Sequence, residues 1–356
     1  MSHPARSQSS RAALSGPARS TLPTVRRRAA VTVTSATDTL EREETGLRRR
    51  PELPRFHGRY VLEQRIGVGG MGTVYRARPV DGGDPVALKA LSDHLGGIDA
   101  ARRFTREIEA LKQLRHPNVV RLLDHGWVAD RPFYVMELVR GPDLTRLVTR
   151  DGPQPANRVC AIVRQLADAL AHAHERGFVH RDIKPSNVVL DFTPGVGEVA
   201  KLADFGLVLT RGDLLRERMT AEDMLLGTPG YIAPEGAQSS RWLGPRSDLY
   251  ALAMIAYYLR TGHHLFRPVD IVVEESHRAA LERGWHRLRE AGGLPSPLEH
   301  VLWRCLRFDR RRRPASAQHL VDVLDALPFA PVWPRDEAAR WWEGYAATTR
   351  PQDKAR

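Results

Sequence analysis

Three polar residues that could carry out a group transfer lie close together in one short segment, residues 180–187, which reads HRDIKPSN. An aspartate can orient a hydroxyl group and take its proton, a lysine can neutralise a phosphoryl oxygen, and an asparagine can bind Mg²⁺. Asp182, Lys184 and Asn187 lie within six residues of a loop, so they can converge on one point. Taken alone, the segment is equally explained as a solvated polar loop.

A glycine-rich segment, GVGGMG, occupies residues 67–72. Glycines let a backbone approach a phosphate closely and present N–H groups to it, although a tight turn without a ligand has the same composition. In a dinucleotide-binding fold such a loop would begin a helix, whereas the β-like residues 73–77 follow here. Lys89 then ends an apolar strand in a chain with only five lysines, which favours a phosphate contact over a surface lysine.

Two more short motifs follow in the sequence. Asp204-Phe205-Gly206 comes directly after an apolar-flanked segment, and Ala233-Pro234-Glu235 follows the residues GTPGY at 227–231. Each motif alone is weak, because short strings recur by chance. Their joint occurrence in this order and at these spacings is specific.

Hydrophobic periodicity predicts the elements that must position these residues. A β-rich first part is expected to contain five strands and a helix capped by Asp99 that runs through Leu114; the strands are Tyr60–Ile66, Thr73–Ala77, Pro85–Leu91, Val119–Leu123 and Phe133–Leu138. After Gly141 the pattern becomes helical, with an apolar stripe over 159–170 and further helices at Leu249–Leu259, Leu298–Leu306 and Ala317–Leu327. Two unlike lobes imply a cleft between them.

Composition limits the class of protein. The chain has 356 residues, of which 42% are hydrophobic and 27% charged, and this excludes collagen-like, wholly disordered and disulfide-scaffold proteins. The net charge is +12, and residues 1–58 carry 11 arginines against 5 acids. Because arginine replaces lysine throughout the chain, we attribute this bias to a GC-rich genome and do not expect nucleic-acid binding. Cys160 and Cys305 are predicted to be buried, and no transmembrane segment is expected.

The motifs identify a family resemblance. From about Arg59 to Leu327 the chain resembles the eukaryotic-type protein kinases, and among them most closely the bacterial serine/threonine protein kinases. The resemblance implies an α+β, bilobal fold, with a small antiparallel β-sheet N-lobe (59–138) that holds one helix and a larger, mainly helical C-lobe (139–327). A disordered Arg/Ser/Pro-rich leader (1–58) is expected before the kinase domain (59–327), and a tail with a Trp-rich helix (328–356) after it.

The resemblance also implies catalytic and metal-binding roles. Lys89 would bind the α- and β-phosphates of ATP and be held by Glu107, for which Glu109 is a neighbouring rival. Asp182 would be the catalytic base. The remaining implied residues are the γ-phosphate contact Lys184 and the two ligands of Mg²⁺ (alternatively Mn²⁺), Asn187 and Asp204.

The resemblance also implies a set of ATP-binding residues. The glycine-rich loop would cover the phosphates, Met136 would be the gatekeeper, and 137–139 would be the hinge that bonds adenine. Apolar residues of both lobes would enclose the purine, although core packing explains these residues equally well. The full set is Ile66, Gly67, Val68, Gly69, Gly70, Met71, Gly72, Thr73, Val74, Ala87, Lys89, Met136, Glu137, Leu138, Val139 and Val189.

Acceptor choice and regulation are implied by four positions. Lys184 is typical of serine/threonine kinases, and Thr228 matches the threonine that faces the acceptor hydroxyl. Arg181 precedes Asp182, as in members switched on by phosphorylation of the activation loop. Thr220 is the candidate for autophosphorylation, and a loop without a switch is the alternative.

Competing functions remain at this stage. A catalytically inactive kinase-fold scaffold is the main alternative, and a small-molecule kinase is a weaker one because such relatives lack the Ala-Pro-Glu segment. Protein substrates are the expected partners, in a cytoplasmic enzyme. A further partner could dock at the leader or at Trp341 and Trp342, although these tryptophans could instead cap the helical lobe. Glu235 is expected to pair with Arg313.

Overall fold

The computed structural model describes residues 55–56, 58–69, 72–91, 97–128, 131–205, 231–327 and 333–349. The chain divides into two units, Met1–Glu52 and Leu53–Arg356, and the described residues all belong to the second. The predicted leader lies almost wholly outside the described residues. So do Gly70, Met71, Gly206, Thr220 and Thr228.

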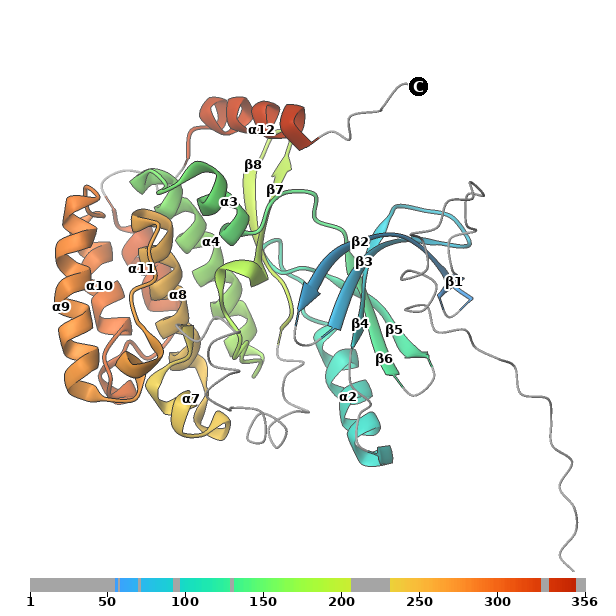
Figure 1. The fold of residues 1–356 in the computed structure, drawn as a ribbon, viewed down its shortest axis with the longest axis horizontal. Coiled ribbons are helices and arrows are strands. Elements are labelled where there is room, and N and C mark those ends of the chain that lie inside the picture. Colours follow the sequence, from blue (N-terminus) through green and yellow to red (C-terminus); the bar gives the residue numbers. More distant parts are fainter. Residues whose placement is uncertain are drawn as a thin grey trace, which may run out of the picture. The chain divides into compact units, whose positions relative to one another are not determined.

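The N-lobe is built on an antiparallel sheet with the strand order β1-β2-β3-β4-β6-β5 (Figure 1). Its strands are β1 (Arg55–Phe56), β2 (Tyr60–Gly69), β3 (Gly72–Pro79), β4 (Val86–Leu91), β5 (Leu122–Val128) and β6 (Arg131–Glu137). The helix α2 (Gly97–Leu111) packs on one face of the sheet through Phe104 and Ile108, both fully buried. The predicted small sheet with one helix is thus confirmed.

Alternation along the central strands decides which side chains face the cleft. In β6, Phe133 and Val135 join one apolar cluster, while Tyr134 and Met136 join a second cluster on the α2 face. Successive residues of a strand point to opposite faces, so this division follows from the period of two. Strand β4 pairs with β6 in a register that sets Lys89 opposite Tyr134. Lys89 therefore lies on the same face as Met136.

Several predicted boundaries differ from the structure. Asp99, which was predicted to cap the first helix, lies inside α2, which begins at Gly97. The expected strand Val119–Leu123 is instead β5, which begins at Leu122, and Val119 forms an isolated parallel bridge with Leu202 of the C-lobe. An apolar residue satisfies both arrangements, so the pattern did not separate them. The helix expected to reach Leu114 ends as α2 at Leu111, followed by turns.

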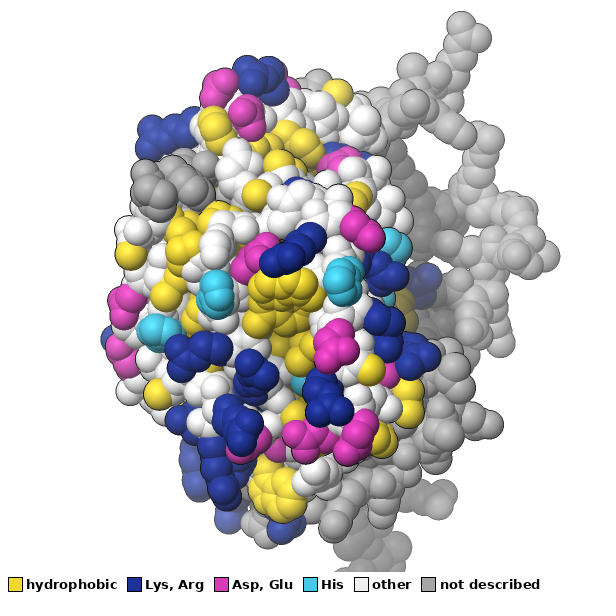
Figure 2. All heavy atoms as spheres, turned by 90° about the vertical axis from the view of Figure 1, so that its left-hand side faces the viewer, with side chains coloured by type: hydrophobic (Ala, Val, Ile, Leu, Met, Phe, Trp, Pro, Cys, Tyr) yellow, Lys and Arg dark blue, Asp and Glu magenta, His cyan; other side chains and the backbone are white. Residues whose placement is uncertain are grey.

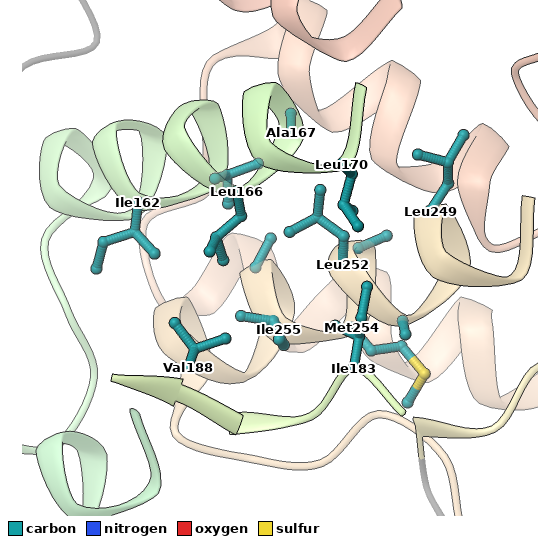
Figure 3. Close-up of a cluster of buried hydrophobic side chains, with 14 of the residues drawn as sticks. Ile162, Leu166, Ala167, Leu170, Ile183, Val188, Leu249, Leu252, Met254 and Ile255 are labelled. Atoms are coloured by element: carbon teal, nitrogen blue, oxygen red, sulfur yellow. The ribbon is translucent and has the colours of Figure 1, made fainter. Parts of the chain in front are cut away.

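The C-lobe is helical and encloses the larger core. Helices α4 (Ala156–Glu175) and α8 (Pro245–Thr261) pack together at its centre. Figure 3 shows Ile162, Leu166 and Leu170 of α4 directed toward Leu252 and Ile255 of α8, and all five are fully buried. The apolar stripe predicted over 159–170 is therefore the buried face of α4.

Shorter elements complete the C-lobe. The strands β7 (Val188–Thr193) and β8 (Gly197–Leu202) pair as an antiparallel hairpin. The remaining elements are α3 (Leu144–Asp151), α7 (Pro234–Gln238), α9 (Glu274–Glu290), α10 (Ser296–Cys305), α11 (Gln318–Asp325), α12 (Arg335–Thr349) and the 3₁₀ helices η1 (Pro185–Asn187), η4 (Ser240–Trp242), η5 (Pro268–Ile271) and η6 (Arg310–Arg312). In the described ranges, no helix combines the length and the apolar character needed to cross a membrane.

Both cysteines are buried and unpaired, as predicted, and burial raises the pKa of Cys160 to about 11 and of Cys305 to about 12. The face of the C-lobe that includes α9 carries basic and acidic side chains intermixed around small apolar patches (Figure 2).

Candidate active site

The loop that carries Asp182 is held by a buried aspartate of α8. Asp248 is 1% exposed, and its carboxylate accepts hydrogen bonds from the backbone N–H groups of His180 and Arg181, both at 2.8 Å. His174, near the end of α4, lies 2.8 Å from the same carboxylate. Arg181 adopts φ 65°, a left-handed conformation that non-glycine residues adopt rarely. Asp248 thus fixes a strained turn immediately before Asp182.

Asp182, Lys184 and Asn187 converge as the sequence predicted. The Nζ of Lys184 lies 2.8 Å from Oδ2 of Asp182. The Nδ2 of Asn187 donates to the main-chain oxygen of Asp182 at 2.7 Å and to its Oδ2 at 3.0 Å. Asn187 ends the short helix η1, which Pro185 begins, and is 7% exposed. The Asp182 carboxylate is therefore held by two donors while it remains half-buried.

Lys89 and Asp204 form a second charged group. The Nζ of Lys89 lies 2.5 Å from Oδ2 of Asp204, and Tyr134 donates a hydrogen bond of 2.6 Å to Oδ1. Burial acts to raise the pKa of Asp204, but the Lys89 charge and the two hydrogen bonds outweigh it, so the pKa lies below its ordinary value. Burial and the neighbouring Asp204 raise the pKa of Tyr134, and the charge of Asp182 contributes as well.

The two charged groups are linked through the backbone. The ring of His180 bonds the carbonyl oxygen of Ala203 at 3.0 Å, and the N–H of Ala203 donates to the carbonyl oxygen of Asn187 at 2.8 Å. His180 also packs on Phe205, with 4.5 Å between the ring centroids. Because Ala203 and Phe205 flank Asp204, these contacts fix Asp204 relative to the Asp182 loop. Asp204 has φ 62°, so this position is strained as well.

Glu107 lies in α2 and is half-buried. Its negative charge acts on Arg181, where Asp248 and Glu107 both oppose the effect of burial; burial dominates, and the pKa of Arg181 lies below its ordinary value. The ion pair recorded for Lys89 is with Asp204. The Lys89–Glu107 pair stays a prediction.

The residues expected around adenine come together in one apolar cluster. Ala87 and Met136 are buried members, and the half-buried residues packed against them include Ile66, Val74, Leu138 and Val139. Val189 is half-buried in β7 of the C-lobe. Glu137, which is expected to belong to the hinge, pairs with Lys201, whose Nζ lies 2.8 Å from Oε1 of Glu137.

The described residues of the glycine-rich loop lie at the adjoining ends of β2 and β3, which pair Gly69 with Gly72. Gly72 has φ +146°, and a β-carbon there would overlap the carbonyl oxygen of Ala90. Glycine is therefore required at Gly72 by both conformation and space. Val68, near the end of β2, is 71% exposed.

The ion pair between Glu235 and Arg313 is confirmed. The Nη1 and Nη2 of Arg313 each lie 2.8 Å from one carboxylate oxygen of Glu235. The hydroxyl of Ser247 donates a further hydrogen bond of 2.7 Å to Glu235. Burial acts to raise the pKa of Glu235, but Arg313 and Ser247 hold it below its ordinary value. This pair anchors α7, which begins with the Ala-Pro-Glu motif, to the core of the C-lobe.

Sequence reasoning missed Tyr134, His174 and Arg158. Tyr134 was treated as a strand residue, and His174 as part of a helix. Arg158 is 1% exposed on the buried face of α4, one residue before Val159. A charged residue on an otherwise apolar helix face must have a buried partner, so the apolar stripe contained a signal for Arg158.

Asn187 and Asp204 fit a magnesium site by their donor chemistry. The amide nitrogen of Asn187 is turned toward Asp182, so the acceptor Oδ1 is directed elsewhere, and Asp204 supplies a carboxylate of lowered pKa. Among the described residues no group of three or more His, Cys, Asp or Glu side chains could hold a metal ion by itself. Mg²⁺ is usually bound by one or two protein oxygens together with substrate phosphates, so these two residues fit it.

The chain is similar in sequence to serine/threonine-protein kinases of other bacteria. The chain is 36% identical over 279 residues to the serine/threonine-protein kinase pkn2 of Myxococcus xanthus, which covers 77% of this chain and 33% of pkn2. It is 37% identical over 224 residues to PknL of Mycobacterium tuberculosis, covering 63% of this chain and 54% of PknL. The chain thus spans between a third and about half the length of these curated relatives.

Solved structures agree with the sequence relatives. The kinase domain of Mycobacterium tuberculosis PknI superposes with a TM-score of 0.57 at 28% identity, over 79% of this chain and 98% of that domain. Rad53 residues 1–466, solved in complex with AMP-PNP, superposes with a TM-score of 0.58 at 26% identity, over 73% of this chain and 63% of that one. The protein kinase domain model matches residues 60–323. With this match across most of the chain, and with the motif residues gathered as described, the chain belongs to the protein kinase domain family.

Proposed function

We propose that this chain is a serine/threonine protein kinase, which transfers the γ-phosphate of ATP to a Ser or Thr hydroxyl of a protein. The observation that carries the proposal is the surroundings of Asp182. Its carboxylate is held by Lys184 and Asn187 and lies close enough to Tyr134 to act on its pKa, while Tyr134 bonds Asp204 directly. These contacts support a site in which a proton acceptor, a cationic phosphate contact and two metal-binding residues would act together.

The proposed reaction assigns one role to each group. Asp182 orients the acceptor hydroxyl and takes its proton as the oxygen bonds to the γ-phosphorus and the bond to the β–γ bridging oxygen breaks. Lys89 and Lys184 neutralise phosphate oxygens. Asn187 and Asp204 would hold Mg²⁺, which when bound stabilises negative charge that develops on the phosphoryl group. Positioning and charge neutralisation, rather than covalent chemistry, account for the catalysis.

ATP is the proposed phosphate donor because the cleft offers an apolar cluster for the purine ring and backbone groups for its polar edge. The apolar cluster around Ala87 and Met136 suits a purine, and the backbone of 137–139 suits its hydrogen-bonding edge. The structural relative Rad53 was solved with AMP-PNP, an analogue of ATP. Lys184 supports Ser/Thr acceptors, because a lysine at this position is typical of serine/threonine kinases.

We further propose regulation by autophosphorylation at Thr220. The support comes from Arg181, whose Nε is buried and has no hydrogen-bond partner among the residues that the structure describes. A buried charged donor without a partner is costly, and a phosphate could satisfy it. Glu107 also acts on Arg181, so phosphorylation would compete with Glu107 and favour its pairing with Lys89.

The test compares phosphate transfer from labelled ATP by wild type, Asp182→Asn and the matched control Asp191→Asn, whose aspartate is half-buried in β7. Asp182→Asn should lower turnover by roughly 10²- to 10⁴-fold, the contribution of a general base. Asp191→Asn should keep wild-type turnover. Mass spectrometry of the wild type should then find phosphate on Ser or Thr, with Thr220 among the sites.

Two outcomes would contradict the proposal. Near-normal turnover of Asp182→Asn would remove Asp182 as the base. A wild type that binds ATP but transfers phosphate neither to itself nor to a general protein substrate would favour the inactive scaffold. An unmodified Thr220 in fully active enzyme would remove the regulatory proposal alone.

A further inference from the structure

The C-terminal helix α12 lies against the β7–β8 hairpin and near α3 (Figure 1). Two neighbouring tryptophans of α12 reach both elements. The Nε1 of Trp341 donates to Asp151, the last residue of α3, at 2.9 Å, and the Nε1 of Trp342 donates to Glu198 of β8 at 3.3 Å. Both indoles are half-buried, so α12 caps this side of the molecule rather than presenting its tryptophans fully to solvent.

A buried ion pair fixes the tail in this place. Arg158 of α4 pairs with Glu198, and both side chains are almost fully buried. The guanidinium of Arg158 lies 3.8 Å from the ring centre of Trp333 and 4.2 Å from that of Trp341. Such cation–π contacts are strongest where the cation has lost its water. The tail therefore supplies part of the environment that makes a buried arginine tolerable.

The same helix reaches the segment that joins the two lobes. Trp342 packs on Gly141, two residues after the hinge residue Val139, so closely that a β-carbon on Gly141 would overlap the Cη2 of the indole. The same β-carbon would also overlap the carbonyl oxygen of Leu190 in β7. The tail and the hairpin thus meet at this face of Gly141 and leave no room for a side chain.

This enclosed segment is tied to the strand that carries the expected floor of the purine pocket. The N–H of Leu190 donates to the carbonyl oxygen of Pro142 at 2.9 Å, and Asp143 forms an antiparallel bridge with Val189. Val189 is the C-lobe residue expected under the adenine. Trp342 therefore lies against the backbone segment that connects the expected hinge to the strand of Val189.

We propose that Trp342 is a positioning residue for nucleotide binding, which acts through Gly141 to hold the hinge against β7. This inference rests on the proposed kinase function only in taking ATP as the ligand. A helix beyond the catalytic lobes would then be part of the ATP site's support. The Trp333 and Trp341 contacts with Arg158 hold the helix, and Trp342 transmits its position to the hinge.

The experiment measures binding of ATP with Mg²⁺ by calorimetry, and KM and kcat, on the full chain. Trp342→Ala should weaken ATP binding by about 2- to 30-fold, the usual range for coupling through packed side chains, while kcat stays within about twofold because no reacting group has moved. Trp342→Phe keeps a ring on Gly141 and should restore most of the affinity, although it loses the bond to Glu198. Trp342→Leu is a milder truncation to use if the alanine variant does not fold.

The matched control is Trp285→Ala. Trp285 is also half-buried, and it lies in α9, which Figure 1 shows on the far side of the C-lobe from α12. It should leave ATP binding unchanged even where it lowers the melting temperature. Unchanged ATP affinity in Trp342→Ala and Trp342→Leu would overturn the proposal and leave the tail a purely structural cap. If Trp342→Ala weakens ATP binding but the wild type transfers no phosphate, the role of Trp342 stands and the result counts against the kinase function alone.

Discussion

The Nζ of Lys89 lies 2.5 Å from Oδ2 of Asp204, so the group proposed to hold phosphate and the group proposed to hold Mg²⁺ neutralise each other directly. Lys89 is 7% exposed, and the side chain of Asp204 is 20% exposed. Little water reaches either charge, so each depends on the other. The ion pair therefore stabilises both charges in the cleft. In the proposed mechanism, phosphate would replace Asp204 as the partner of Lys89, and Mg²⁺ would replace Lys89 as the partner of Asp204.

Lys89→Met should lower kcat/KM for ATP by at least about 10-fold, because a hydrogen bond to a charged group contributes roughly 1.5–3 kcal/mol. It also leaves Asp204 without its counter-charge. Lys112→Met is the matched control, since Lys112 pairs only with the exposed Glu109 among the described contacts and lies outside the cleft. Steady-state kinetics at varied ATP checks the prediction. Equal effects of the two substitutions would contradict it.

Tyr134→Phe should move the acid limb of the pH profile of kcat/KM to higher pH. The tyrosine hydroxyl donates to the charged form of Asp204 and so lowers its pKa. Without that bond the pKa rises, Asp204 becomes protonated at a higher pH, and activity is lost earlier on acidification. Phenylalanine retains the ring in the apolar cluster on the α2 face of the sheet. The profile is compared with that of Tyr75→Phe, a half-buried tyrosine of β3; a Tyr134→Phe profile that coincides with wild type contradicts the assignment.

Arg313→Met should destabilise the C-lobe by roughly 3–5 kcal/mol, because it leaves the buried Glu235 carboxylate without its partner. Arg312→Met is the control, since the side chain of Arg312, next to Arg313 in the chain, is 77% exposed. Denaturant unfolding at pH 7 measures both. Adding Glu235→Gln to Arg313→Met should recover part of the loss, as the remaining group is then uncharged. A loss below about 1 kcal/mol for Arg313→Met would show that water reaches Glu235 in the folded state.

Local pattern predicted most of the fold. Apolar runs bounded by turn residues identified β2, β3, β4 and β6, and the apolar stripe identified α4, since burial leaves a trace in the sequence. Val119 shows where this fails. Its apolar side chain is required in either case, yet its backbone bridges Leu202 of the other lobe instead of beginning β5. Such pairing depends on how the lobes approach each other, which no local pattern records.

The site divides in the same way. Asp182, Lys184 and Asn187 were predicted to converge because six residues of chain cannot separate them far. The ion-pair partner of Lys89 could not be predicted in this way. Glu107 and Asp204 both offer a carboxylate, and which of them pairs with Lys89 depends on where α2 lies. Likewise nothing near Trp342 in the sequence points to Gly141, about 200 residues earlier. Contacts over such distances arise only from the packing of whole elements.

Stability should fall with acidity because of His277, which is 1% exposed in α9 and stacks on Phe266 with 4.4 Å between ring centroids. Burial, aided by the charge of Arg313 and opposed by Asp270, lowers the pKa of His277 to about 4 from the ordinary 6.5. Between these values the unfolded chain binds a proton that the folded chain cannot, so the free energy of unfolding falls as the pH drops from 6.5 toward 4.

His277→Phe should reduce this fall, because phenylalanine can stack on Phe266 and has no proton to bind. It forfeits the contact of 3.3 Å with the hydroxyl of Tyr250, so its stability at pH 7.5 is the reference for the comparison. Burial also lowers the pKa of His116 and His264, so part of the acid dependence remains. Melting temperatures between pH 7.5 and 4.5 are compared with those of His286→Phe, an exposed position of the same helix. Parallel curves for the two variants would show that His277 takes up its proton without unfolding the C-lobe.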